Sequence, residues 1–181
     1  MTGEPPSTTA AARSCPVVDA ADTQNEVAVD PSRWGSLLAE VLGAEGVGVR
    51  ASASLTFVSE AEMAALNAEH LGGDGPTDVL SFPIDGLEAR AAGSGSADTP
   101  PAIVGDVVVC PKVAERNAAA RGRELDDEIA LLVVHGGLHL VGWDHGDDAA
   151  RSAMWERQRE LLLAFHGVAA DPDDVRPGEC R

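Results

Sequence analysis

Three histidines within eleven residues form the part of the sequence best suited to chemistry. They lie in the segment HGGLHLVGWDH, at His135, His139 and His145. A four-residue spacing on a helix places two side chains on one face, one turn apart, so His135 and His139 can chelate one ion. Gly142 favours the left-handed turn that ends a helix, after which the reversed chain can bring His145 to the same point.

Three imidazole nitrogens suit a zinc-class ion that keeps one coordination position open. We therefore expect one Zn²⁺ per chain, although three imidazoles also accept other divalent ions. An open position is typical of catalytic zinc, because structural zinc is normally closed by four protein ligands. Gly136 and Gly137 indicate a crowded helix, since each glycine costs a helix interior about 1 kcal/mol relative to alanine and is tolerated where a group approaches closely.

The same histidine spacing occurs in metzincin proteases, which place a glutamate directly after the first histidine as the general base. Here Gly136 stands at that position, so the sequence argues against proteolysis. No general base can be assigned. Asp144 either accepts a proton in the reaction or orients an imidazole or caps a turn. Asp106 is similarly ambiguous between the site and a strand end, and Ser81 between a phosphate contact and a backbone hydrogen bond.

Two further segments complete a resemblance to a known family. They are PTDVLSFP at 76–83 and GDVVVC at 105–110, which Pro111 follows. With the histidine segment, in this order and spacing, the sequence over about residues 26–166 resembles the YbeY family of zinc-dependent endoribonucleases. The resemblance implies a metal-dependent endoribonuclease selective for single-stranded RNA, with His135, His139 and His145 as its zinc ligands. It also implies maturation of ribosomal RNA at the 3′ end of the small-subunit RNA, ribosome quality control, and the small ribosomal subunit as a partner.

One position departs from the family pattern. Many members have an arginine shortly after the Leu-Asn pair that precedes PTDVLSFP, and Leu71 stands there in this chain. A guanidinium can hold a phosphate with two hydrogen bonds, so its absence bears on substrate affinity or catalytic strength. His70 is either a partial substitute or a surface histidine without a role. The departure leaves open an alternative, a zinc-containing ribosome-associated factor without nuclease activity.

The chain carries a strong negative charge. Thirty acidic against thirteen basic residues give a net charge of −17, which repels nucleic acid and anionic membranes. Binding to RNA therefore needs a metal ion or a local basic patch. Residues 112–123 have a local excess of three positive charges, from Lys112, Arg116, Arg121 and Arg123 against Glu115. This segment is either a phosphate-facing strip or a solvated helix face.

Aromatic residues are few. The chain has no tyrosine, three phenylalanines and three tryptophans, so a base-stacking platform is not expected. We expect Trp143 at the rim of the site, and Trp34 and Trp155 in the core. The longest apolar run, residues 129–134, is far shorter than the roughly 20 residues of a membrane span, and the first thirty residues contain no apolar stretch typical of a signal peptide. These features predict a cytoplasmic protein that makes no membrane contact.

The expected fold is a single α+β domain with about four strands in a mixed sheet and about five helices. We expect the domain at 25–168 with a mobile loop at 86–102, a disordered tail at 1–24 and a polar tail at 169–181. Strands are predicted at 26–29, 47–58, 78–84 and 103–110. Helices are predicted at 31–44, after a cap at Asp30, and at 111–121, 124–141 and 148–165. A further helix is predicted to begin at a capping box at Ser59. The helix at 124–141 is apolar on all sides, which predicts a central helix that carries the metal motif. The sequence predicts no oligomeric state.

Overall fold

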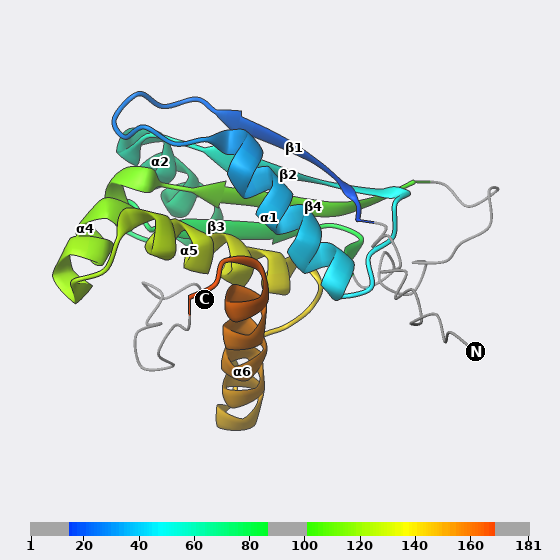
Figure 1. The fold of residues 1–181 in the computed structure, drawn as a ribbon. Coiled ribbons are helices and arrows are strands. Elements are labelled where there is room, and N and C mark those ends of the chain that lie inside the picture. The colour runs from blue at the N-terminus through cyan, green and yellow to red at the C-terminus, as the bar shows by residue number, and fades with distance from the viewer. Residues whose placement is uncertain (1–14, 87–100, 169–181) are drawn as a thin grey trace, which may run out of the picture.

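Four strands form one mixed sheet in the computed structural model, which describes residues 15–86 and 101–168. The sheet order is β1-β2-β4-β3 (Figure 1). Strand β1 (Val17–Asp22), β2 (Ala51–Phe57) and β4 (Ala102–Val109) run parallel, and β3 (Val79–Pro83) runs antiparallel to β4. Within the described residues β3 is an edge strand, a place where Pro83 costs the sheet no ladder hydrogen bond. The predicted α+β class and mixed sheet are confirmed.

Five helices lie in the described residues. Their bounds agree with the sequence prediction to within one or two residues: α1 (Pro31–Ala44), α2 (Glu60–Leu71), α4 (Pro111–Arg121), α5 (Leu125–Leu140) and α6 (Asp148–Phe165). The local signals work as expected. The Asp30 side chain accepts hydrogen bonds from the first turn of α1, and Ser59 and Glu62 form a reciprocal capping box on α2.

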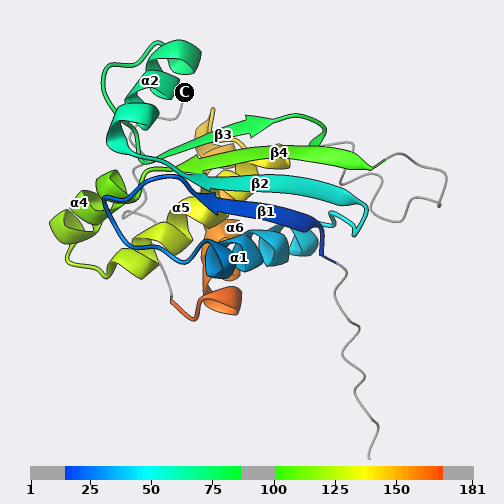
Figure 2. The same cartoon turned by 90° about the horizontal axis from the view of Figure 1, so that it is seen from above.

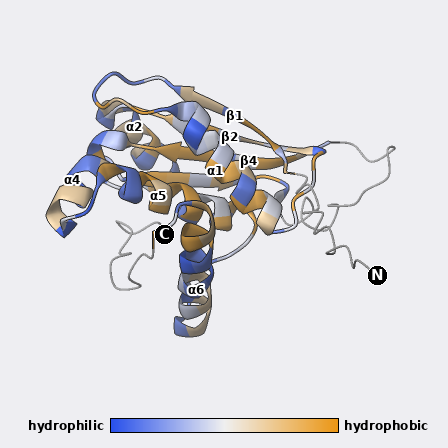
Figure 3. Ribbon diagram, viewed as in Figure 1, coloured by the Kyte–Doolittle hydropathy of each residue, from blue (hydrophilic) through white to orange (hydrophobic). Residues whose placement is uncertain are grey.

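Helices α1 and α5 cover one face of the sheet (Figure 2). Helix α1 packs on β1 and β2, α5 packs on β3 and β4, and α6 packs on α5 and α1. Helix α5 is buried from Glu128 to Leu138, which confirms the predicted central helix. Figure 3 shows the hydrophobic residues concentrated in the strands and in α5. None of the helices in 15–86 and 101–168 is both long and apolar enough to cross a membrane.

A smaller apolar cluster lies on the opposite face of the sheet. Successive residues of a strand point to opposite faces, so Val107 and Val109 of β4 join the main core while Val108 joins the second cluster. Met63 from α2 is fully buried in this second cluster, and Phe82 from β3 packs against it. The second cluster thus ties α2 to the edge of the sheet next to β3.

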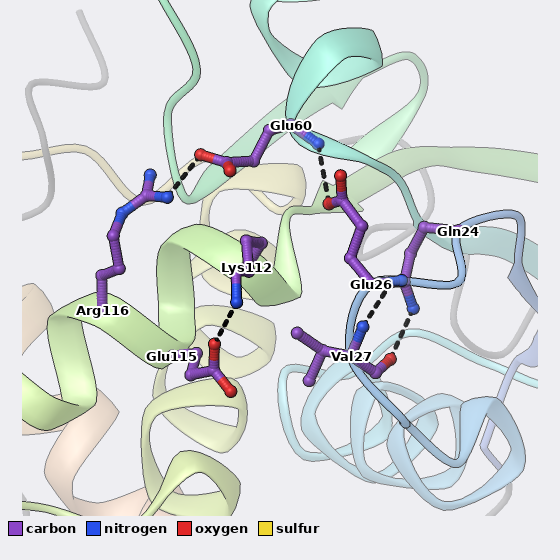
Figure 4. Close-up of polar contacts among 7 residues, drawn as sticks. All are labelled: Gln24, Glu26, Val27, Glu60, Lys112, Glu115 and Arg116. Atoms are coloured by element: carbon purple, nitrogen blue, oxygen red, sulfur yellow. Dashed lines mark hydrogen bonds and ion pairs between the residues drawn. The ribbon is translucent and has the colours of Figure 1, made fainter.

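The prediction for the start of the domain is wrong. Strand β1 occupies 17–22, within the segment predicted as a disordered tail, and residues 26–29 form no strand. The Oε1 atom of Gln24 accepts hydrogen bonds from the backbone N–H of Glu26 at 2.6 Å and of Val27 at 2.9 Å, and these bonds hold the segment in a turn (Figure 4). The predictions for residues 1–14, for 87–100 of the loop and for the tail at 169–181 lie outside the described residues.

The three tryptophans differ in their surroundings. Trp34 is 2% exposed in the main core, as predicted. Trp155 is only half-buried on α6, with the guanidinium of Arg151 over its ring, so its prediction as a core residue is wrong. It lies one position after the buried Met154, at the margin of the helix face that packs inward.

Candidate metal centre

The last two turns of α5 place His135 and His139 side by side. Their Nε2 atoms are 3.1 Å apart and their rings lie edge to face. Two nitrogens bound to one tetrahedral zinc at 2.0–2.1 Å are about 3.3 Å apart, so the pair already has the spacing of a chelate. The prediction that the two imidazoles lie on one face of the helix, one turn apart, is confirmed.

The turn after α5 brings His145 to the same point. Gly142 has φ +88°, a left-handed conformation, and the backbone N–H of Trp143 bonds back to the carbonyl of Leu138 at 3.1 Å. The chain reverses there, and the ligand atoms of His135, His139 and His145 all lie within 4.8 Å of one another. The structure therefore brings together all three histidines that the sequence predicted.

The state of these imidazoles fits a metal ion. The Nε2 atom of His145 is buried and has no hydrogen-bond partner within the described residues, a situation that is rare unless a ligand completes the site. Burial, assisted by His139, lowers the pKa of His135 to about 3. Burial and the neighbouring His145 also lower the pKa of His139. His135 and His139 are therefore neutral near pH 7, with lone pairs available for a zinc-class ion.

Each of the two helical histidines is oriented by a hydrogen bond on its other nitrogen. Gln158 of α6 is 1% exposed, and its Oε1 accepts from Nδ1 of His135 at 3.1 Å. The carbonyl of Trp143 accepts from Nδ1 of His139 at 2.9 Å. Protons on Nδ1 leave the Nε2 lone pairs directed at the shared point. Sequence reasoning missed Gln158, although a glutamine in register with the buried Met154 and Leu161 of α6 is a visible signal.

A buried carboxylate supports this turn from a distant part of the chain. Glu45 follows α1 and is 6% exposed. Its Oε2 accepts from the indole N–H of Trp143 at 2.9 Å, and its Oε1 accepts from Nε of Arg157 at 2.7 Å. No local sequence signal links these residues, because Glu45 lies 98 positions before Trp143.

The paired glycines mark close packing, as predicted. A Cβ atom on Gly136 would lie 2.8 Å from Cγ1 of Val107, and one on Gly137 would lie 2.8 Å from Cδ1 of Leu38. The carbonyl of Gly136 also accepts a hydrogen bond from the Ser81 hydroxyl at 3.3 Å. Ser81 thus meets a backbone group, and the glutamate that a metzincin places after its first histidine would crowd Val107 at position 136.

A pocket of about 530 Å³ opens beside His139. It lies between the end of α2, strand β3 and the turn after α5, and Trp143 stands in its wall, as predicted. Its lining residues are His70, Leu71, Leu80, Ser81, Phe82, Pro83, His139, Gly142, Trp143 and Asp144.

The two other candidate carboxylates bond to nearby groups. Oδ1 of Asp144 accepts from the backbone N–H of Gly146 at 2.9 Å, a contact that shapes the turn before His145. Asp106 accepts from the hydroxyl of Ser54 on the neighbouring strand β2. The contact of Asp144 matches its structural alternative, whereas Asp106 lies inside β4 and not at a strand end as that alternative had it.

The predicted basic strip is engaged with carboxylates. Lys112 bonds to Glu115 at 2.7 Å, and Arg116 pairs with Glu60 at the start of α2 (Figure 4). Neither cation is among the described residues that line the pocket beside His139. The geometry favours a solvated helix face over a phosphate-facing strip.

The other two basic residues of the segment face inward. Arg121 and Arg123 both pair with Glu128, which is 0% exposed, at 2.6 Å and 3.1 Å. Burial raises the pKa of Glu128, and the two guanidinium groups oppose that shift. This cluster joins α4 to α5 and serves the fold.

The fold and the histidine group together define a class: a single α+β domain whose central helix and following turn present three histidines that could hold a metal ion. A sequence model described as Endoribonuclease YbeY matches residues 19–166. The chain belongs to the YbeY endoribonuclease family.

Several relatives carry the same description. Endoribonuclease YbeY of Thermobifida fusca is 43% identical over 146 residues, covering 80% of this chain and 92% of the relative. Endoribonuclease YbeY of Acidothermus cellulolyticus is 42% identical over 143 residues, covering 78% and 87%. A solution structure of a Thermotoga maritima protein superposes with a TM-score of 0.58 at 27% identity, covering 90% of this chain and 99% of that one.

Proposed function

We propose that this chain is a single-strand-specific endoribonuclease that uses one Zn²⁺ held by His135, His139 and His145. The observation that carries the proposal is the convergence of the three imidazoles, with the buried Nε2 of His145 lacking a partner in the described residues, beside an open pocket. Membership of the YbeY family supports RNA as the substrate.

We further propose that the substrate is ribosomal RNA. Maturation of the small-subunit RNA at its 3′ end, ribosome quality control and contact with the small ribosomal subunit are the roles that the sequence resemblance implies. A cytoplasmic location follows from these roles. The net charge of −17 makes a bulk electrostatic attraction to RNA unfavourable, so affinity depends on the metal centre and on the pocket beside it.

The chemistry of phosphodiester hydrolysis requires a Lewis acid for a phosphoryl oxygen and an activated attacking oxygen, and a zinc-class ion supplies both when bound. The protein's part is to present neutral imidazoles in fixed directions. Gln158 and the carbonyl of Trp143 keep the protons of His135 and His139 on Nδ1. Helix α5 fixes two of the rings, and the turn through Gly142 fixes the third. Asp144 lines the pocket and is the nearest carboxylate in sequence to the ligands, but its bond to Gly146 gives it a positioning role.

A cleavage assay with metal analysis tests the proposal. Purified protein should contain about one zinc per chain and cut an unstructured RNA. A chelator should abolish cutting, and added zinc should restore it. His139→Ala should stay folded and lose cleavage, because His139 is half-buried and lies at the end of α5. The ends of the products identify the attacking oxygen: a 2′,3′-cyclic phosphate would show attack by the 2′-hydroxyl rather than by water.

The same experiment separates the alternatives. A ribosome-associated factor that uses zinc only for stability would leave RNA uncut when loaded with metal, and His139→Ala would unfold it. A metalloprotease would cut a peptide library instead, although Gly136 stands where the required glutamate would be.

A further inference from the structure

The pocket beside His139 has walls unlike those of a phosphate site. Its described lining contains no lysine or arginine, and its one carboxylate is Asp144. A phosphate placed away from the metal centre would therefore meet apolar side chains and a negative charge, with no cation to offset its own charge. The lining instead suits a neutral, flat and partly apolar group.

An aromatic pair forms one wall. The ring of His70 lies edge to face against the ring of Phe82, with the centroids 4.9 Å apart. Phe82 and Trp143 both line the pocket and account for two of the six phenylalanines and tryptophans in the chain. Leu71, at the position where many relatives have arginine, adds an apolar side chain that is 42% exposed.

The wall is held in place by its own local contacts. Gly72 ends α2 in a left-handed conformation with φ +67°, directly after His70 and Leu71. The side-chain amide of Asn67 donates to the carbonyl of Gly75 at 2.8 Å and closes the following loop onto the helix. On the other side, Phe82 packs against the second apolar cluster. The end of α2 therefore presents His70 and Leu71 at a fixed place beside β3.

We infer that this pocket binds one unpaired nucleobase of the RNA, at a nucleotide next to the scissile phosphate. The inference rests on the proposed nuclease function and adds where the base lies. A volume of about 530 Å³ is within the range of small-molecule sites, and the pocket is continuous with His139, where the phosphate would lie. Stacking on aromatic rings holds a base without positive charge. Many relatives have an arginine at position 71 that could bind a phosphate. In this chain, contact of a base with His70 and Phe82 replaces that interaction.

The inference explains selectivity for single strands. A base can enter the pocket only when it is unpaired and turned out of a helix. The substrate would then be held at two points, the phosphate at the three histidines and the adjacent base between the end of α2 and β3. This site does not need the extended aromatic platform that the composition excludes, because a single open pocket can hold one base with only a few aromatic side chains.

Substrates that lack one base test the inference directly. The cut site in an unstructured RNA is mapped first, and an abasic ribose is then placed at each nucleotide that flanks it. Removal of the base at one of these positions should raise KM roughly tenfold for the wild-type enzyme. His70→Ala should raise KM for intact RNA by a similar factor and should lose sensitivity to the abasic site. His70→Phe should restore both, and Glu69→Ala, an exposed neighbour outside the pocket lining, should match wild type.

A second measurement does not depend on catalysis. RNA with 5-iodouridine at the sensitive position should form a light-induced cross-link to Phe82, Trp143 or His70, identified by mass spectrometry. If the wild-type enzyme cuts intact and abasic RNA equally well, the base pocket is overturned while the nuclease function stands. If metal-loaded protein cuts no RNA at all, the nuclease function is overturned and the base pocket with it. Cross-links confined to residues outside the pocket would also overturn it.

Discussion

The indole N–H of Trp143 donates a hydrogen bond to Oε2 of Glu45 at 2.9 Å, across 98 residues of sequence. The carbonyl of the same tryptophan accepts the Nδ1 proton of His139 at 2.9 Å, and Arg157 holds the second carboxylate oxygen of Glu45 at 2.7 Å. A carboxylate at the end of α1 thus controls, through one tryptophan, the direction of a histidine on α5. From this relation we predict that affinity for a metal ion at the three histidines depends on groups that do not touch the ion.

Trp143→Phe removes the indole N–H while keeping an aromatic ring that packs against the core. We expect the affinity for zinc, measured by competition with a chromogenic chelator, to fall about tenfold, because the carbonyl of residue 143 loses its anchor. Trp155→Phe is the matched control, since Trp155 is half-buried on α6 and bonds to no ligand histidine in the described residues. Equal zinc affinity in wild type and Trp143→Phe would show that the turn needs no support from Glu45.

Gln158 offers a second test of ligand orientation. Gln158→Leu leaves the buried Nδ1 proton of His135 without its acceptor, at a cost of about 1–3 kcal/mol in unfolding free energy. Zinc affinity should fall roughly 10- to 100-fold, because the imidazole is then free to adopt the other tautomer. Gln158→Glu keeps an acceptor at that place and should retain affinity much closer to wild type. Chelator competition and urea unfolding measure the two effects separately, and equal losses in both variants would contradict an orienting role.

The two glycines of α5 should respond differently to alanine. The Cβ of Gly136→Ala lies 2.8 Å from Cγ1 of Val107, a stiff β-branched side chain in a central strand, whereas that of Gly137→Ala lies 2.8 Å from the flexible end of Leu38 and 3.2 Å from Cγ1 of Val41. Overpacking costs about 1–3 kcal/mol, and the better helix propensity of alanine offsets about 1 kcal/mol. These two terms leave a net cost of about 0–2 kcal/mol, so Gly136→Ala should lie near the upper end of that range in urea unfolding, while Gly137→Ala should be near neutral. The reverse order would mean that strand β4 yields more easily than α1.

Much of the fold and the centre of the site could be predicted from local signals. The spacing of His135 and His139 specified their shared face, and caps such as Asp30 and Ser59 placed helix starts within a residue. Those signals act between residues that are close in sequence. Strand β1 escaped prediction because its sequence, VVDAAD, is short and partly polar and is specified by its pairing with β2. The turn at 26–29 escaped because one side chain, Gln24, binds its backbone.

The contacts that complete the site could not be predicted in this way. Glu45, Gln158 and the pocket beside His139 depend on four helices and a strand edge meeting in space, and no periodicity encodes such a meeting. The basic segment at 112–123 is the opposite case, a clear sequence pattern whose partners are not visible in the sequence. Its charge is plain in the sequence, but the sequence left open whether it forms a phosphate-facing strip or a solvated face, because its partners Glu60 and Glu128 come from other helices.

Asp78, in the segment PTDVLSFP, is 2% exposed and does not line the pocket beside His139. Its Oδ1 accepts from the backbone N–H of Val79 at 2.9 Å, and its Oδ2 accepts from the amide of Asn117 at 3.0 Å. Burial raises the pKa of Asp78 above its ordinary 3.8, and the hydrogen bond from Val79 opposes the shift. In the folded state the carboxyl therefore holds its proton to a higher pH than in the unfolded chain.

The direction of this pKa shift determines how the stability of the fold depends on pH. Below the unfolded pKa the group is protonated in both states, and the stability it contributes is lost as pH rises through its raised folded pKa. Asp78→Asn does not titrate, and its amide oxygen can still accept from Val79. The stability advantage of wild type over Asp78→Asn should therefore shrink as pH rises from the ordinary pKa of 3.8 through the raised pKa of the folded state. Urea unfolding of both proteins in the presence of a chelator measures it, since the titration of His135 is common to both and cancels in the difference. An advantage that grew with pH would show that the hydrogen bonds to the carboxylate outweigh its burial.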